Sequence, residues 1–325
     1  MNSKAESVIQ EKAIYQDLDF GITLVDAEYG KSGVAALYLM IEGDEVAIIE
    51  TGTNHSVPLI KQVLEDKNIS FDNVRYIIPT HVHLDHAGGA GELMHLCKNA
   101  QLVIHPFGAA HMIDPTKLEA GAMAVYGEQK FRELYGNIRP VEASRVIEAP
   151  GFFELELNGR NLTFLDTPGH ARHHFCVFDK KSNGIFTGDT FGISYPQLTT
   201  ARGRFIFATT TPVQFDPGSL LQSIECLASR KADIMYLTHF GPLKPTEALI
   251  NQLKRSVRSF ANMGLSLQTE PENRIERLQV MIKNYLLESL EEMGCEQSPE
   301  FQAEVIEMDV LLNAQGLDFW LGRQG

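Results

Sequence analysis

Short apolar runs alternate with segments of helical periodicity from about residue 22 to residue 189. Three runs, ITLVDAEY, AALYLMIEG and EVAIIETG, follow one another with glycine turns between them, and this pattern predicts neighbouring strands. The segment 57–69 repeats apolar residues at close to helical spacing, which predicts a helix lying on that sheet. The run VRYIIPTH then predicts a buried strand. Alternating strands and helices of this kind are typical of an α/β fold.

The pattern changes twice further along the chain. Residues 107–137 predict a helical insertion, which we interpret either as a cover on the sheet or as a wall of a substrate pocket. Strand-like runs resume after about residue 152, and the run IMYLTHFGP ends the α/β part. Beyond it only helical patterns follow, so we expect a main domain over residues 1–245 and a C-terminal helical region over 246–325. This tail either caps the site and packs on its own body or presents the face of a homodimer.

Composition narrows the class of protein. The 325 residues are 44% hydrophobic and 22% charged, and no stretch approaches the roughly 18 to 20 apolar residues of a membrane span, so we expect a soluble protein with no membrane partner. The formal charge of −14 repels phosphate backbones, which argues against nucleic-acid partners. The N-terminus lacks the pattern of a signal peptide, and the four cysteines show no Cys-x-x-Cys spacing. We therefore expect reduced thiols and a cytoplasmic location.

A dense polar cluster ends the strand VRYIIPTH. The segment THVHLDHAGGAGEL places His81, His83, Asp85 and His86 within six residues, ahead of a helix expected to begin near Gly88. Three imidazoles and a carboxylate are costly to bury without partners. Neutral imidazoles and carboxylates are ligands for zinc, iron or manganese, so the cluster predicts a metal site that can serve two adjacent ions.

The remaining ligands are expected at the ends of later strands. His170 follows a Pro-Gly turn in DTPGHARHH, Asp189 follows a strand in GIFTGDTFG, and His239 follows an apolar run in MYLTHFGP. Counted from His86, the successive gaps are 84, 19 and 50 residues. Each residue alone is a weak signal, but a strand end is where α/β folds place their sites, so together they predict one shared centre.

This order of residues resembles the metallo-β-lactamase-fold hydrolases, and most of all their glyoxalase II and lactonase-type branch, over about residues 20–245. The resemblance implies a four-layer αββα sandwich with a dinuclear site along one edge of the paired sheets. It implies two ligand sets and one bridging carboxylate, which are His81, His83 and His170 for the first metal, Asp85, His86 and His239 for the second, and Asp189 between them. True zinc β-lactamases generally lack the bridging carboxylate, so antibiotic hydrolysis is not the expected activity.

Two adjacent cations lower the pKa of a shared water and polarise the carbonyl that it attacks. We therefore expect a hydrolase that uses a metal-bridging hydroxide to cleave a carbonyl ester, such as a thioester or a lactone, in a small-molecule substrate. The expected cofactors are two divalent transition metals, zinc first, with iron or manganese as alternatives. Asp85 is the candidate catalytic residue that takes up and returns a proton.

Four further residues are candidates with competing structural interpretations. Tyr195 lies in the loop where related lactonases place a phenol that donates to the substrate carbonyl, although its spacing differs, and packing would also explain it. His174 and Arg202 are candidate substrate contacts, against a strand start and a solvated surface charge. Glu50 stands where relatives typically carry the aspartate of Asp-x-Gly, and its longer carboxylate is expected to change how the ligands are braced.

Two other functions compete with hydrolysis. A mononuclear iron dioxygenase acting on a thiol or persulfide would use much of the same ligand set. A regulatory member of the fold could keep its metals while the helical tail restricts the pocket. Metal content and oxygen uptake distinguish the dioxygenase from the hydrolase.

Overall fold

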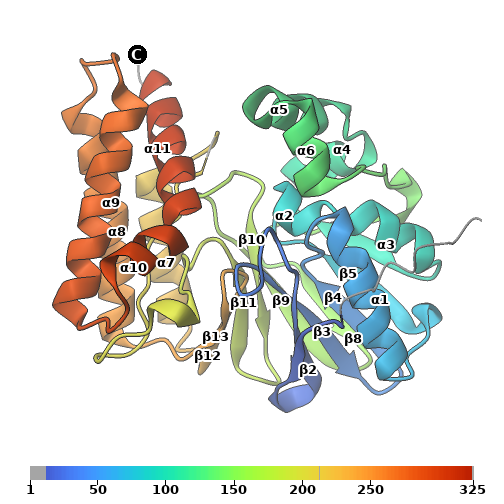
Figure 1. Cartoon of the computed structure of the whole chain (residues 1–325). Coiled ribbons are helices and arrows are strands. Elements are labelled where there is room, and N and C mark those ends of the chain that lie inside the picture. Colours follow the sequence, from blue (N-terminus) through green and yellow to red (C-terminus); the bar gives the residue numbers. More distant parts are fainter. Residues whose placement is uncertain (1–11, 212, 324–325) are drawn as a thin grey trace, which may run out of the picture.

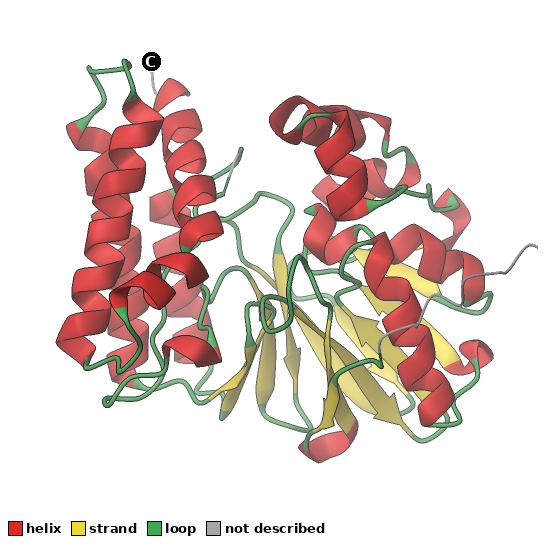
Figure 2. Ribbon diagram, in the orientation of Figure 1, coloured by secondary structure: helices red, strands yellow, loops and turns green. Residues whose placement is uncertain are grey.

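Two β-sheets face each other, and helices cover the outer side of each (Figure 1, Figure 2). The computed structural model describes residues 12–211 and 213–323. The first eleven residues, part of the segment that we interpreted as unlike a signal peptide, lie outside the described residues. Among the described helices, none is both long enough and apolar enough to cross a membrane.

The first sheet follows the chain order strand by strand. Its strands are β1 (Tyr15–Asp17), β2 (Ile22–Asp26), β3 (Ala36–Glu42), β4 (Glu45–Ile49), β5 (Val74–Ile78), β6 (Gln101–Ile104) and β7 (Val146–Glu148). Strands β1 to β4 pair antiparallel, which confirms the predicted meander, and β4 to β7 pair parallel. The short edge strands β1 and β7 were not predicted, because three residues are too few to show an alternating pattern.

The second sheet has the order β13-β12-β11-β10-β9-β8. Its strands are β8 (Glu154–Leu157), β9 (Arg160–Asp166), β10 (Phe175–Asp179), β11 (Gly184–Gly188), β12 (Ile234–Leu237) and β13 (Gly241–Leu243). Only β11 and β12 pair parallel, and all other neighbours are antiparallel.

Aromatic side chains fill the space between the sheets. Tyr38 of β3 contacts Phe186 of β11 with ring centroids 5.2 Å apart, and Phe186 stacks on Tyr236 of β12 at 4.6 Å. The Tyr38 hydroxyl donates to the Leu237 carbonyl at 2.5 Å, so the buried phenol keeps a partner and joins the two sheets. This contact holds the ends of β3 and β12 together at the edge where the polar cluster lies.

Helices cover the outer sides of both sheets. Val57, Ile60 and Val63, at helical spacing, pack against the first sheet as predicted, and Leu220 and Ile224 pack against the second. The helices that do this are α1 (Val57–Asp66), α3 (Ala90–Leu96) and α7 (Pro217–Ser229), and a short α2 (Leu84–Ala87) precedes α3. The result is the four-layer αββα sandwich that the family resemblance implied.

Two groups of helices extend beyond the sandwich. The insertion forms α4 (Pro106–Ile113), α5 (Thr116–Tyr126) and α6 (Glu128–Tyr135), and the tail forms α8 (Glu247–Ser266), α9 (Arg274–Met293), α10 (Pro299–Val305) and α11 (Glu307–Gly322). In Figure 1 the insertion is green and the tail orange to red, and they rise on opposite sides of the same sheet edge. Leu253, Leu286 and Leu317 of the tail share one apolar core with α7 and the second sheet. The domain boundary near residue 245 remains a prediction.

Candidate metal centre

The segment after β5 turns sharply into α2. We expected the helix to begin near Gly88, but it begins at Leu84, so Asp85 and His86 stand on its first turn. A Cβ atom on Gly89 would lie 2.8 Å from the Thr51 carbonyl oxygen. Only glycine therefore lets the chain approach the loop after β4 this closely, and the Thr51 hydroxyl donates to the His86 carbonyl at 2.8 Å.

The seven predicted ligands come together at this edge in two groups. In each group the nitrogen and oxygen atoms that can bind a metal lie within 4.8 Å of one another. The groups are His81, His83, His170 and Asp189, and Asp85, His86 and His239.

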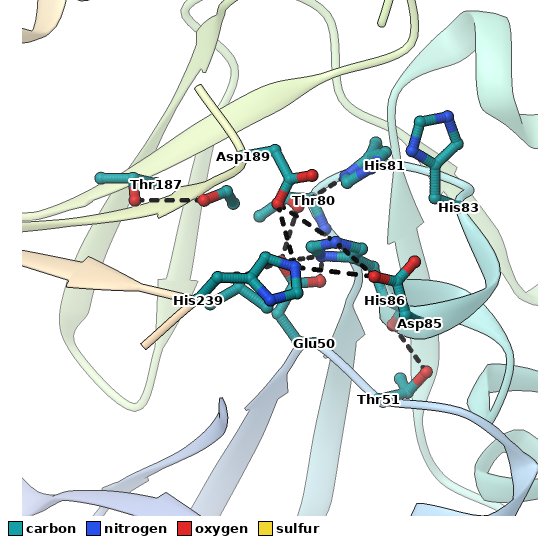
Figure 3. Close-up of polar contacts among 12 residues, drawn as sticks. Glu50, Thr51, Thr80, His81, His83, Asp85, His86, Thr187, Asp189 and His239 are labelled. Carbon is teal, nitrogen blue, oxygen red and sulfur yellow. Dashed lines mark hydrogen bonds and ion pairs between the residues drawn. The ribbon is translucent and has the colours of Figure 1, made fainter. Parts of the chain in front are cut away.

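Asp189 faces both groups (Figure 3). Its Oδ2 lies 3.2 Å from His170 Nε2. Its Oδ1 lies 3.2 Å from His86 Nε2 and 3.5 Å from His239 Nε2. One carboxylate therefore lies between the two sets of imidazoles, as a bridging ligand must.

Several buried polar atoms in the centre have no hydrogen-bond partner. They include His81 Nε2, and also His86 Nε2 and Asp189 Oδ1, which lie 3.2 Å apart without the geometry of a hydrogen bond. Buried polar atoms are almost always paired, so unpaired atoms on three converging side chains require an explanation. A cation supplies one, because imidazole nitrogens and carboxylate oxygens are the donor set of zinc and of other first-row transition metals. The residues present therefore fit bound metal ions.

Glu50 contacts one proposed ligand and the threonines beside the centre. Its side chain is buried, with Oε1 3.0 Å from His86 Nδ1, 2.6 Å from Thr80 Oγ1 and 3.0 Å from Thr238 Oγ1. The Thr80 backbone N–H donates to Oε2 at 3.0 Å. The Thr80 hydroxyl also lies 3.1 Å from His81 Nδ1, so one carboxylate orients His86 directly and His81 through Thr80. The side chain at this position thus contacts the His86 ring of one group and connects to His81 of the other through Thr80.

His239 is oriented in the same way by a different partner. Its Nδ1 lies 2.8 Å from the Val34 carbonyl oxygen, which can only accept a hydrogen bond, so Nδ1 carries the proton. The other ring nitrogen then faces Asp85 and Asp189. The backbone therefore fixes the ring orientation that a metal ligand needs.

Burial and charge keep the two groups in different protonation states. Burial, with the neighbouring His170, lowers the pKa of His83 to about 3, so this imidazole is neutral. Burial opposes ionisation of Asp85, but His86 and His239 outweigh it and lower its pKa to about 2. Burial also disfavours charged His239, yet the Asp189 and Asp85 carboxylates raise its pKa to about 9. A metal ion must therefore displace a proton from His239 when it binds.

His174 is not a pocket residue, and this corrects the expectation that it contacts substrate. Its side chain is fully buried, and its Nε2 accepts the backbone N–H of Asp189 at 3.2 Å. Its Nδ1 lies 2.9 Å from Thr167 Oγ1 and 3.2 Å from Thr190 Oγ1. With both nitrogens engaged, the ring holds the loop that carries Asp189.

Arg202 is also placed away from the centre. It is exposed on the turn between Thr200 and Gly203 and does not line the cavity described below, so the structure gives it no role in substrate binding. Its neighbour Arg204 turns inward instead and donates to the carbonyl oxygens of Ser194 and Phe240. Arg202 and Arg204 thus point in different directions although they are two residues apart, and the composition of the loop does not reveal this.

Tyr195 does reach the site, together with a residue that sequence reasoning missed. It is buried, and its hydroxyl donates to Asp309 Oδ1 of α11 at 3.2 Å. Burial raises the pKa of Asp309 to about 7, although His239 and Tyr195 lower it. The one signal for Asp309 was an acidic residue inside the apolar segment MDVLLNAQG.

A cavity of about 770 Å³ opens on the centre. His83, Asp85, Asp189 and His239 lie on its wall, as does Tyr195. The insertion and the tail supply most of the remaining lining. Both of the functional interpretations left open above, an insertion as pocket wall and a tail as cap, describe this arrangement.

The fold and the site together define an αββα sandwich with a candidate metal centre at one edge of its sheets. The family model of the metallo-beta-lactamase superfamily matches residues 32–239. The chain belongs to this superfamily. The comparisons do not single out the glyoxalase II and lactonase-type branch, which remains a prediction.

Relatives extend the likeness over most of the chain. The metallo-beta-lactamase fold-containing protein ST1585 of Sulfurisphaera tokodaii is 28% identical over 216 residues, which cover 65% of this chain and 75% of that protein. The crystal structure of ST1585 has a TM-score of 0.61 at 22% identity and covers 94% of this chain and 99% of that chain. The family protein TTHA1429 of Thermus thermophilus has a TM-score of 0.64 at 20% identity, with 94% of each chain covered. At these identities the structures show the fold alone.

Two shorter matches carry names that state an activity. The acyl-coenzyme A thioesterase MBLAC2 of Gallus gallus is 29% identical over 118 residues, 34% of this chain and 40% of that protein. The thioesterase pkgB of Emericella nidulans is 27% identical over 154 residues, 47% of this chain and 34% of that protein. The chain thus spans less than half of either thioesterase.

Proposed function

We propose that this protein is a dinuclear metal-dependent hydrolase that cleaves a carbonyl ester, with a thioester as the first candidate. The observation that carries the proposal is the position of Asp189, whose two oxygens face imidazoles of both groups. A site for a single ion would not need the second group of Asp85, His86 and His239. The thioesterases among the relatives favour a thioester among the possible carbonyl esters.

In this proposal His81, His83 and His170 hold one ion, Asp85, His86 and His239 hold the other, and Asp189 is shared. When bound, two such cations lower the pKa of a water molecule and polarise a substrate carbonyl. Zinc is the first candidate, with iron and manganese as alternatives.

Asp85 is the proposed proton carrier of the reaction. Its side chain is 21% exposed and lies on the cavity wall, whereas His86 beside it is fully buried. Its low pKa leaves it ionised and free to accept a proton, which it passes on readily because it is a weak base. A thiolate leaving group needs little help from a general acid, which suits a carboxylate whose basicity is reduced by its neighbours.

Tyr195 is the proposed donor to the substrate carbonyl. Tyr195 lines the cavity, and its hydroxyl is engaged with Asp309. Donation to a substrate therefore requires that the hydroxyl exchange one oxygen acceptor for another. Such an exchange leaves the buried Asp309 carboxyl without its tyrosine partner, which costs about 1–3 kcal/mol that substrate binding must offset.

The test is turnover of a substrate panel by protein of measured metal content. The panel contains a thioester, a lactone, a phosphodiester and a β-lactam, assayed before and after chelation and after reloading with zinc, iron or manganese. We expect thioester or lactone cleavage only by metal-loaded protein, and loss of activity in Asp85→Asn but not in the exposed control His95→Asn. Oxygen uptake with a thiol substrate and one iron per chain would instead support the dioxygenase and overturn the proposal.

Removal of the tail would not test the regulatory alternative, in which the tail restricts the pocket. Truncation near residue 245 would expose the apolar residues that α7 and the second sheet share with α8, α9 and α11. Such a protein is expected to unfold or aggregate, so its inactivity would carry no information. Single substitutions on the cavity side of α11 leave this core intact and are used below.

A further inference from the structure

Helix α11 is apolar on two faces. Val310, Ala314 and Leu317 pack into the core that it shares with α8 and α9. On another face Met308, Leu311 and Leu312 line the cavity, and Met308 is 51% exposed. A helix on a protein surface normally carries polar residues on the side away from its core. Packing against the body of the protein therefore does not explain the second apolar face of α11.

The opposite wall repeats this pattern. Leu118, Ala122 and Tyr126 of α5, each four residues from the next, all line the cavity. Tyr29 and Tyr135 join them, and their hydroxyls lie 3.0 Å apart. Because these hydroxyls satisfy each other, the wall presents rings and methyl groups rather than unpaired polar atoms.

Outside the proposed metal centre and Asp309, the charged residues of the lining are exposed to solvent. Lys31, Lys117, Glu304 and Glu307 belong to the lining and are exposed. The buried polar residues of the lining are members of the proposed metal centre, the pair Tyr195 and Asp309, and His173 and Thr209. One enclosure thus joins a polar reaction centre to two apolar walls.

The cavity volume sets the size of ligand. Pockets of roughly 300 to 1,000 Å³ hold ligands the size of a drug molecule. At about 770 Å³ this cavity is far larger than an acetyl or butanoyl group requires. A short acyl group would leave most of the apolar surface in contact with water.

We propose that the cavity binds the hydrocarbon acyl chain of a thioester substrate between α5 and α11. The inference rests on the proposed function, since it assigns the apolar part of the substrate to the acyl side of the scissile bond. The leaving group of a biological thioester is polar and suits the exposed, charged rim. The insertion and the tail are then the two elements that select acyl length.

Two substitutions test the walls separately, each with a control on the same helix. Ala122→Phe fills the cavity from α5, and Ala124→Phe adds the same ring at an exposed position outside the cavity lining. Met308→Glu places a charge on the α11 wall, and Phe319→Glu does so at a residue that is 43% exposed and outside the lining. None of the four belongs to the proposed metal centre.

The first readout is binding to metal-free protein, measured as displacement of the neutral fluorophore N-phenyl-1-naphthylamine by dodecanol or butanol. Each additional buried methylene should raise affinity about fourfold. We expect Ala122→Phe and Met308→Glu to weaken dodecanol binding by about tenfold or more, the equivalent of two lost methylenes, with butanol and both controls unchanged.

The second readout is the ratio of kcat/KM for dodecanoyl and butanoyl thioesters in metal-loaded protein. We expect the ratio to favour the longer chain and to fall in the two wall variants only. Turnover without any preference for chain length would overturn the acyl site and leave the hydrolase standing. Chain-dependent binding without turnover of any ester would overturn the hydrolase and, with it, the assignment of the bound chain as an acyl group. Equal effects of variants and controls would overturn the site itself.

Discussion

Replacement of Glu50 by glutamine changes one oxygen of a buried carboxylate into an amide nitrogen. Four donors surround the native carboxylate, three at Oε1 and the Thr80 backbone N–H at Oε2. If the amide nitrogen takes the place of Oε2, it faces the Thr80 N–H. If it takes the place of Oε1, it faces His86 Nδ1 and two threonine hydroxyls. Either orientation sets donor against donor.

The size of the effect follows from these contacts. At least one buried donor loses its acceptor, which costs about 1–3 kcal/mol of the free energy of unfolding. His86 also loses the negative partner that orients its ring and increases its basicity, and such changes typically lower metal affinity by about 10-fold to 100-fold. His81 is affected less, because Thr80 lies between it and Glu50.

The assay is a zinc titration of metal-free protein against a chromophoric chelator, with the metal bound per chain measured by elemental analysis. Thermal unfolding of the metal-free variant measures the structural cost separately. Glu142→Gln, at an exposed position, is the control. The reasoning is refuted if Glu50→Gln binds zinc as tightly as the wild type at both sites while remaining folded.

Three other changes have defined outcomes. Asp189→Asn should lower both metal occupancy and activity, and full retention of both in paired elemental and kinetic measurements would remove the bridge. In metal-free protein the raised pKa of Asp309, about 7 against 3.8, means that the folded chain keeps a proton that the unfolded chain loses between about pH 4 and pH 7. Stability should fall across that window as pH rises, by about 4 kcal/mol at most, and Asp309→Asn should flatten the slope in denaturant titrations. Gly316→Ala should cost about 3 kcal/mol, because its Cβ would lie 1.6 Å from the Thr210 carbonyl oxygen, whereas Gly322→Ala meets nothing within 4 Å and should leave the denaturation midpoint unchanged or slightly higher.

Most of the sandwich could be predicted from the sequence because its signals are local. Apolar runs of five to seven residues mark β2, β3 and β4, and helical spacing marks α1. The seven residues of the centre were found because each is a ligand type that follows a strand. Strands that run in the same direction have their carboxyl ends at a common edge, as β9, β11 and β12 do, so residues that follow them come together.

The partners of these residues could not be predicted in the same way. Glu50 meets Thr238 across 188 residues, and Tyr195 meets Asp309 across 114, so both contacts depend on how separate layers pack. His174 and His170 lie four residues apart in one loop, and no periodicity tells which ring joins the proposed metal centre. The two apolar faces of α11 could not be predicted either, because the sequence pattern of such a helix is the same as that of an ordinary buried helix.

The central claim is that the chain holds two ions side by side, and anomalous diffraction from crystals of zinc-loaded protein tests it most directly. The account predicts two peaks about 3.5–4 Å apart, one among His81, His83 and His170, the other among Asp85, His86 and His239, with Asp189 between them. A single peak, or none, in crystals of fully loaded protein would contradict it.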